Sequence, residues 1–165
     1  MHDKIKTIRV GLFLVMLNLL FGISLGVGFG VKENSFKAYV ATGIKNNPQL
    51  HDEKSQSKIW RYGQRAHFHA IGLAAFSIGL VLLTMFSSLT SKLKSWCSIL
   101  IGLGGLYPLA WLTMYLLAPS IGRDAAHHHL LTEFLTYVGV LGLLAGFFLL
   151  SANLFFGCFS EEATE

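Results

Sequence analysis

The chain has 165 residues, of which 53% are hydrophobic and only 13% are charged. Such an apolar composition excludes an ordinary soluble enzyme and a disordered chain. The formal net charge of +4 is compatible with nucleic acid binding. However, the basic residues lie at the ends of apolar segments rather than along one face, so we expect a lipid bilayer as the partner and no nucleic acid.

Four segments with almost no charged residues are each long enough to cross a bilayer, which takes about 20 mainly apolar residues. They predict transmembrane helices over about 9–31, 64–88, 96–117 and 125–156, with a polar loop at 32–63. Phe36, Tyr39, Val40 and Ile44 recur at helical spacing in this loop, which predicts a short helix at the membrane surface. The expected fold class is all-α: a single transmembrane domain over 1–165, built as an up-and-down four-helix bundle with a short interfacial helix in the first loop.

The first segment begins with basic residues, like a signal peptide, but its apolar part is too long for one, so we expect a retained helix. Within it, Gly22 and Gly26 form a small-x-x-x-small ridge that favours close approach of another helix. Lys and Arg are more numerous on the side of the long loop, whereas the dense basic start favours the N-terminus inside. We expect the N-terminus inside, in a bacterial inner membrane.

Five histidines are placed where they can converge. His67 and His69 lie near the start of the second predicted span, and His127, His128 and His129 lie near the start of the fourth. Antiparallel spans bring these two starts to one membrane face, which predicts a single layer of histidines. Ionisable residues within a bilayer are costly and therefore suggest a functional site.

Helical geometry selects one pair among them. His69 shares a helix face with Gly72, and His128 shares one with Gly139, since successive residues turn by about 100°. Small residues are typical of protein-facing surfaces in membranes. We therefore expect His69 and His128 to face each other across the bundle, with room for a flat ligand.

This arrangement suits haem b. The iron takes a neutral imidazole nitrogen on each side, the macrocycle occupies an apolar slot, and the propionates need cations at the polar edge. Arg61, Arg65 and Arg123 are the predicted cations. Trp111 and Tyr115 of the third span are expected in the same layer, against the ring edge or a propionate.

Other interpretations compete with haem. Histidines near the ends of spans often lie among lipid head groups. Imidazole and carboxylate ligands could instead hold copper, zinc or iron, and the residues available for such a non-haem metal site are His67, His69, His127, His128, His129 and Glu133. A third alternative is a structural or assembly subunit whose polar layer packs against partner helices.

The stretch from Arg65 to Leu73, RAHFHAIGL, resembles the H-x-H-x-x-G-type helix of small bacterial four-helix membrane proteins and of nitric-oxide-response haem membrane proteins, which are distantly likened to haem-copper oxidases. The resemblance implies haem or metal ligation by His67 or His69 together with a histidine of the fourth helix. The triple histidine and the long charged loop depart from that pattern. A second resemblance, in helix order alone, is to bis-histidine bundles of the cytochrome b type.

The expected function is that of a membrane haem b protein that transfers electrons or senses a redox or gaseous signal. A quinol, a redox protein or a second copy of the chain is the expected partner. If the protein is an enzyme, we expect an oxidoreductase component. If His69 and His128 both bind the haem, the protein should lose its haem when either is replaced by Ala, whereas His67→Ala should retain it.

Overall fold

The computed structural model describes residues 2–160, with side chains from Ile5 onward. Apart from one short 3-10 helix, all of its regular elements are α-helices. In chain order these are α1 (His2–Asn46), η1 (Pro48–Leu50), α2 (Ser55–Phe86), α3 (Ser91–Leu103), α4 (Leu106–Ile121), α5 (Arg123–His127) and α6 (Leu130–Phe156).

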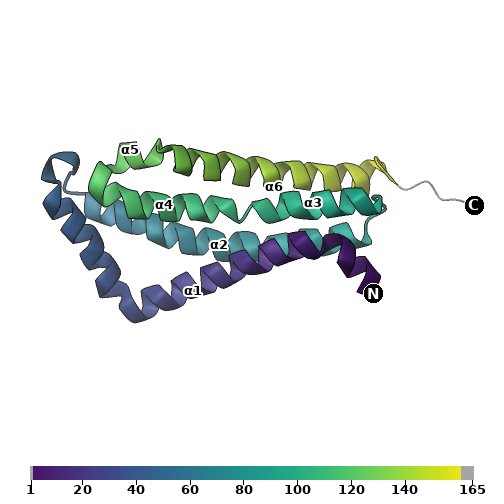
Figure 1. The fold of residues 1–165 in the computed structure, drawn as a ribbon, viewed down its shortest axis with the longest axis horizontal. Helices are drawn as coiled ribbons and strands as arrows, with labels where there is room; N and C mark the ends of the chain where they lie inside the picture. Colours follow the sequence, from purple (N-terminus) through teal and green to yellow (C-terminus); the bar gives the residue numbers. More distant parts are fainter. Residues whose placement is uncertain (1, 161–165) are drawn as a thin grey trace, which may run out of the picture.

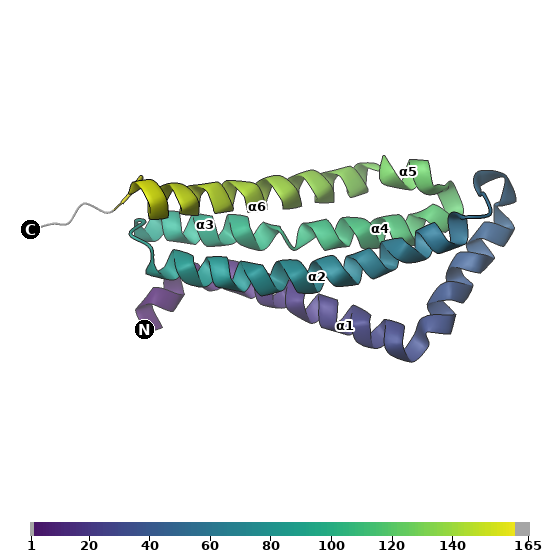
Figure 2. The same cartoon turned by 180° about the vertical axis from the view of Figure 1, so that it is seen from behind.

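Four antiparallel rods make up the bundle (Figure 1). They are the first part of α1, then α2, then α3 and α4 end to end, and finally α6. The N-terminus and the end of α6 lie at one end of the bundle, and η1 lies at the other, as the view from behind also shows (Figure 2). The predicted all-α, up-and-down four-helix bundle is confirmed.

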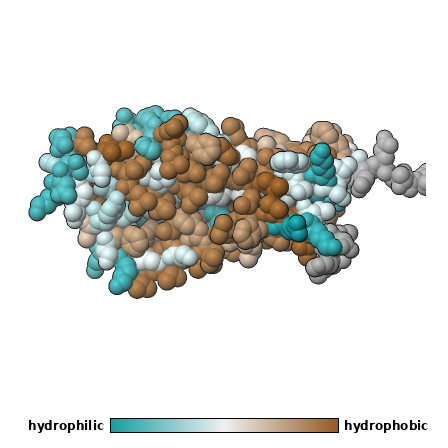
Figure 3. All heavy atoms as spheres, viewed as in Figure 1, coloured by the Kyte–Doolittle hydropathy of each residue, from teal (hydrophilic) through white to brown (hydrophobic). Residues whose placement is uncertain are grey.

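The surface of the bundle matches a bilayer. On the face that Figure 3 shows, hydrophobic residues form a broad band across the middle of the molecule, and hydrophilic residues gather toward its two ends. Four helical segments are long and apolar enough to cross a membrane: Ile5–Asn46, Ser55–Phe86, Ser91–Ile121 and Leu130–Phe156. The protein thus has the architecture of a multi-pass membrane protein.

The second helix begins much earlier than predicted, at Ser55 instead of position 64. At its start the Ser55 hydroxyl donates to Asp52 Oδ1 at 2.7 Å and accepts from the Asp52 backbone N–H at 3.0 Å. Hydropathy marks only the membrane-embedded part of a helix, whereas backbone hydrogen bonding continues beyond it. His67 and His69 therefore lie well inside α2.

Two helical stretches of α1 meet at a kink at Lys32, whose backbone is non-helical (φ −129°, ψ 28°). After the kink the chain turns back across the end of the bundle (Figure 1). The predicted helix in the first loop is confirmed, and it packs on α4. Val40 is fully buried, and the Tyr39 hydroxyl donates to the carbonyl of Leu116 at 2.6 Å.

The third span is broken at Gly104-Gly105, between α3 and α4. Pro108 has no N–H to donate to the carbonyl of Gly104, four residues earlier. The N–H of Tyr107 donates to that carbonyl instead, at 3.2 Å. The third predicted span is therefore two helices, and the interruption lies just before Pro108.

Glycines set the close packing between helices. A Cβ on Gly11 would lie 2.2 Å from the carbonyl carbon and oxygen of Ser98 in α3, and one on Gly22 would lie 2.9 Å from the Ala70 Cβ in α2. Since real Cβ atoms do not approach so closely, only glycine allows these backbones to lie where they do. The ridge predicted at Gly22 and Gly26 is thus a packing surface for α2.

Candidate functional site

His67 of α2 is held by the backbone of α1. Its Nδ1 lies 2.8 Å from the carbonyl oxygen of Gly22. Since a carbonyl can only accept, Nδ1 carries the hydrogen. In the neutral imidazole this leaves Nε2 with a free lone pair, which is the form that binds metals.

A cavity of about 290 Å³ lies beside this ring, between α1 and α2. It is lined by Gly26, Phe29, Gly30, Glu33, Trp60, Gln64, His67 and Phe68. Gly22, Gly26 and Gly30 are spaced by four residues and so lie on one stripe of α1. A Cβ on Gly26 would lie 2.6 Å from the His67 Cε1, whereas one on Gly30 would meet no atom within 4 Å. The absence of a side chain at Gly26 thus leaves room for the imidazole, and the position of Gly30 borders the open space beside it.

Aromatic rings form part of the walls, and the lining residue Glu33 is ion-paired to Lys37. The ring of Phe29 lies edge-on to Trp60 at 5.1 Å and to His67 at 6.4 Å between centroids. The ammonium group of Lys37 lies 5.6 Å from the Trp60 ring centroid and 2.6 Å from Glu33 Oε1. The cavity therefore combines an apolar wall with a charged edge.

His69 points to another side of α2, because residues two apart differ by about 200° around a helix. Its ring lies 5.0 Å from that of Tyr107 and is stacked at 5.9 Å, with an interplanar angle of 20°, on Trp111. Arg65 lies 4.6 Å above the Trp111 ring. His69 is thus covered by aromatic side chains of α4.

The three consecutive histidines lie at the junction of α5 and α6, and all are exposed. His128 Nδ1 lies 3.1 Å from Glu133 Oε1, and its ring is 4.9 Å from that of His127. His129 caps α6, since its Nδ1 accepts from the backbone N–H of Leu131 at 3.3 Å. Their contacts are local ones that end one helix and begin the next.

The prediction that His69 and His128 face each other is therefore wrong. His69 packs on Tyr107, and the residue of α6 that packs on the Tyr107 backbone is Gly139, whose Cβ would lie 2.7 Å from the Tyr107 nitrogen. His128 lies several turns away along the chain, outside α6. The single histidine layer fails because α2 begins at Ser55, which places His69 about 20 Å along that helix.

The two glycine faces expected to leave room for a flat ligand do not do so. Gly72 is exposed, with nothing within 4 Å of its Cβ position. The space beside Gly139 is occupied by the backbone of α4. The protein-facing side of α2 is made instead by small alanines, namely Ala66, Ala70 and Ala74.

The residues predicted to hold propionates beside that pair have other partners. Arg123 Nη2 lies 3.2 Å from Asp52 Oδ2, and the Tyr115 hydroxyl donates to the carbonyl of Phe36 at 2.8 Å. Arg65 and Trp111 pack on each other, as described above. Arg61 belongs to a separate cavity of about 240 Å³, which is lined by Lys58, Arg61, Tyr62 and Arg65.

The predicted non-haem metal ligands are also not gathered. From Ile5 to Ser160, the structure brings no three His, Cys, Asp or Glu side chains close enough to hold a metal ion. His67 and His69 lie on different sides of α2, and His127, His128, His129 and Glu133 lie at the α5–α6 junction. That set of six ligands is therefore wrong as one site.

Sequence reasoning overlooked the cavity beside His67. Its signal was present in the four-residue spacing of Gly22, Gly26 and Gly30, followed by the charged residues Lys32 and Glu33. Phe29 and Trp60 gave no signal, because nothing in the sequence shows that the packing of α1 on α2 brings these two rings together.

No family model, curated protein or solved structure matches the chain. The resemblance of the RAHFHAIGL stretch to haem membrane proteins stays a prediction.

Proposed function

We propose that this protein is a membrane haem b protein in which His67 supplies an axial imidazole, at the cavity between α1 and α2. One observation carries the proposal: the Nδ1–H of His67 is held by the Gly22 carbonyl at 2.8 Å, beside a cavity walled by glycines and aromatic rings. His67 thus takes the role that the sequence had given to His69.

The hydrogen bond to Gly22 supports the assignment. A metal-binding histidine almost always donates its other ring N–H to a carbonyl or carboxylate, which fixes the ring and its tautomer. Between Nδ1 and Nε2, only Nε2 is then available to the iron. The neighbouring Gly26 has no side chain that would occupy the space beside Nε2, since a Cβ there would lie 3.3 Å from that atom.

The residues around the cavity are of the types that contact a porphyrin. Gly26 and Gly30 offer a flat, side-chain-free wall, and Phe29 and Trp60 offer aromatic surface. Lys37, which is ion-paired to the lining residue Glu33, would be the cation for a propionate in place of the predicted arginines. The volume of about 290 Å³ is at the small end of ordinary ligand sites, so the macrocycle would extend outward past the open face of Gly30.

Bound haem supplies one-electron chemistry. His67 is the one histidine among the residues that line this cavity, so any second iron ligand would have to be a small gaseous molecule or a histidine of a second copy. This favours redox or gas sensing, or electron exchange with a quinol or a redox protein as an oxidoreductase component. In a bacterial inner membrane with the N-terminus inside, His67 lies in the half of the bilayer nearer the outer face.

The test is a spectrum together with a metal analysis. The chain should be expressed with adequate haem, purified in detergent, and measured for Soret absorption and for iron. We expect one haem per site and iron in the same ratio, with little copper or zinc. A colourless, iron-free protein that remains folded by circular dichroism contradicts the proposal, and bound copper or zinc without haem favours the non-haem alternative.

A further inference from the structure

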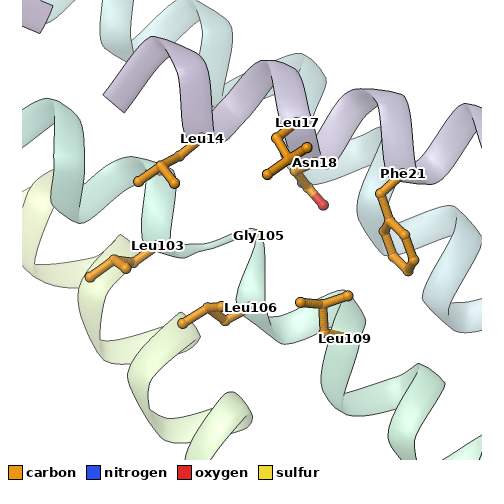
Figure 4. Close-up of a pocket in the computed structure, with 9 residues that line it drawn as sticks. Leu14, Leu17, Asn18, Phe21, Leu103, Gly105, Leu106 and Leu109 are labelled. Atoms are coloured by element: carbon orange, nitrogen blue, oxygen red, sulfur yellow. The ribbon is translucent and has the colours of Figure 1, made fainter. Parts of the chain in front are cut away.

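A second cavity, separate from the one at His67, lies between α1 and the broken third span. Its volume is about 270 Å³, and it is lined by Leu14, Leu17, Asn18, Phe21, Gly102, Leu103, Gly105, Leu106 and Leu109. Figure 4 shows these residues around the break between α3 and α4. Asn18 is the only polar side chain among them.

The cavity lies beside the helix break. α3 ends at Leu103 and α4 begins at Leu106, and Gly102 and Gly105 in this region pack against α1. A Cβ on Gly105 would lie 3.0 Å from the Asn18 Cβ, and one on Gly102 would lie 2.9 Å from the Leu14 Cβ. α1 and the third span are in close contact at Gly102 and Gly105. The cavity lies beside these contacts and is lined mainly by leucines.

The amide of Asn18 has one satisfied end and one unsatisfied end. Its Nδ2 donates to the carbonyl of Ala70 in α2 at 3.1 Å. Since that carbonyl cannot donate, the nitrogen must be on the Ala70 side and the oxygen on the other. Asn18 is only 7% exposed, and its Oδ1 is buried with no hydrogen-bond partner in the protein. In Figure 4 this oxygen is directed into the cavity.

These features define what the cavity can hold. The occupant must donate one hydrogen bond to Oδ1, because an unpaired acceptor in an apolar interior is unfavourable. Apart from that donor, the part of the occupant that is buried in the cavity must be apolar, and it cannot be an anion, since no cation lines the cavity. One water molecule fits poorly, because a buried water needs two to four polar partners and fills only about 30 Å³.

We propose that this cavity binds a membrane-soluble phenol or hydroquinol, whose ring hydroxyl donates to Asn18 Oδ1 while the ring packs among Leu103, Leu106 and Leu109. Phe21 adds an aromatic contact for the ring. The chain of the ligand leaves toward the bilayer past Leu17, which is 51% exposed. The inference does not depend on haem at His67, because the two cavities share no lining residue.

The first experiment compares 2-decylhydroquinone with its dimethyl ether, which keeps the ring and the decyl chain but carries methoxy groups in place of the hydroxyls. Each is titrated into the protein in phosphatidylcholine nanodiscs, and binding is followed by the ligand-dependent rise in Tm. We expect saturable stabilisation by the hydroquinone, with a midpoint about tenfold lower than that of the ether. Equal midpoints, or no saturable effect of either ligand, overturn the proposal.

Two variants separate the hydroxyl from the shape of the cavity. Asn18→Leu removes the acceptor, so the midpoints of hydroquinone and ether should converge to within about twofold. Because Asn18→Leu also removes the bond to Ala70, Leu109→Trp serves as the second variant: it fills the cavity, keeps Asn18, and should abolish binding of both ligands. Leu144→Trp, at a 43% exposed position on α6, is the matched control and should bind as the unchanged protein does.

Two further outcomes would also decide against the inference. If 1-decanol competes as well as the hydroquinone, the occupant is an aliphatic alcohol and the ring assignment is wrong. If Leu109→Trp leaves the hydroquinone midpoint unchanged, the ligand binds elsewhere. His67→Ala should bind the hydroquinone normally, so failure of the haem proposal and failure of this one give different results.

Discussion

The imidazole of His67 and the carbonyl of Gly22 join the second helix to the first through a 2.8 Å hydrogen bond. A main-chain carbonyl within a helix already accepts from the N–H four residues later, and its second lone pair is free for a side chain. Gly22 and Gly26 both lack side chains, so the imidazole can reach the α1 backbone. One bond thereby sets the tautomer of His67 and the separation of two helices.

The first prediction concerns the haem ligand. His67→Ala should lower the haem content of the purified protein about tenfold or more, because the axial nitrogen is lost. His69→Ala should retain the haem, since that ring packs on Trp111 away from the cavity. Both are measured by the ratio of Soret to protein absorbance, with circular dichroism to establish folding.

This reverses the expectation drawn from the sequence, in which His69 was essential and His67 was not. Loss of haem from His69→Ala, with retention in His67→Ala, would restore the earlier interpretation. His128→Ala is a third variant in the series and should also leave the spectrum unchanged, because His128 is exposed and contacts Glu133.

The second prediction concerns the wall of the His67 cavity. In Gly26→Ala the new Cβ would lie 2.6 Å from the His67 Cε1, so the ring must move and its bond to Gly22 must weaken. We expect a loss of about 1–3 kcal/mol in the free energy of unfolding together with weaker haem binding. Gly30→Ala, where the Cβ position is open, is the control and should unfold at the same temperature or slightly higher. Equal unfolding temperatures for Gly26→Ala and Gly30→Ala would contradict the close packing of Gly26 on His67.

The third prediction tests the contact between α1 and α3. Gly11→Ala puts a Cβ 2.2 Å from backbone atoms of Ser98, which cannot rotate away as a side chain could. The helices must separate, at a cost of about 1–3 kcal/mol or more. Gly72→Ala, at an open helical position on α2, should instead gain up to about 1 kcal/mol from its higher helix propensity. Thermal unfolding in one detergent compares the two.

The fourth prediction concerns the part of α1 after the kink. Tyr115 is buried and its hydroxyl donates to the carbonyl of Phe36, so Tyr115→Phe should cost about 1 kcal/mol of the local stability of this segment. Hydrogen exchange of residues 33–46 should become faster while exchange in α6 is unchanged. Tyr137→Phe, at a 61% exposed position, is the control. Unchanged exchange in Tyr115→Phe would show that the segment is held by other contacts.

The fifth prediction concerns pH at the loop before α2. The hydrogen bond from the Ser55 hydroxyl lowers the pKa of the Asp52 carboxyl below its ordinary value of 3.8, against a partial desolvation that raises it, and Arg123 and Lys58 lower it further. A depressed pKa means that this contact stabilises the folded protein above about pH 4 and is lost as the pH falls through the lowered pKa. The side-chain carboxyl resonance of Asp52 should report a midpoint below 3.8.

Two variants check the cause of that shift. Ser55→Ala should raise the midpoint of Asp52 most, and Arg123→Gln should raise it less and in a salt-dependent way, because exposed charges are screened. A midpoint that is the same in Ser55→Ala as in the unchanged protein contradicts this account.

The fold could be read from the sequence because each span is a local property. Charge-free segments of sufficient length must be helices in a bilayer, where every backbone group needs a partner within the chain. The break near Pro108 was predictable for the same reason, since a missing N–H acts on the carbonyl four residues earlier. The start of α2 was not predictable from hydropathy, because the turns from Ser55 to Arg65 are helical but polar.

The prediction of the candidate site depended on where α2 begins. Once α2 begins at Ser55, His69 lies too deep to meet the histidines at the α5–α6 junction, and the pairing with His128 fails. Glycines face the protein on α6, as predicted. On α2 that prediction is wrong, because Gly72 faces outward and alanines face the protein. Small residues permit close packing, but they do not show which of two small-residue faces is used.

Sequence alone thus determined that the chain has four segments able to cross a membrane as helices and that the first loop contains a helix. Only the tertiary structure decided that His67 bonds to Gly22, that His69 is covered by Trp111, and that Asn18 carries an unpaired oxygen beside a broken helix. The reason is physical. Apolar length and helical hydrogen bonding act between near neighbours in the chain, whereas the partner of a side chain depends on the depth and rotation of a helix that is distant in sequence.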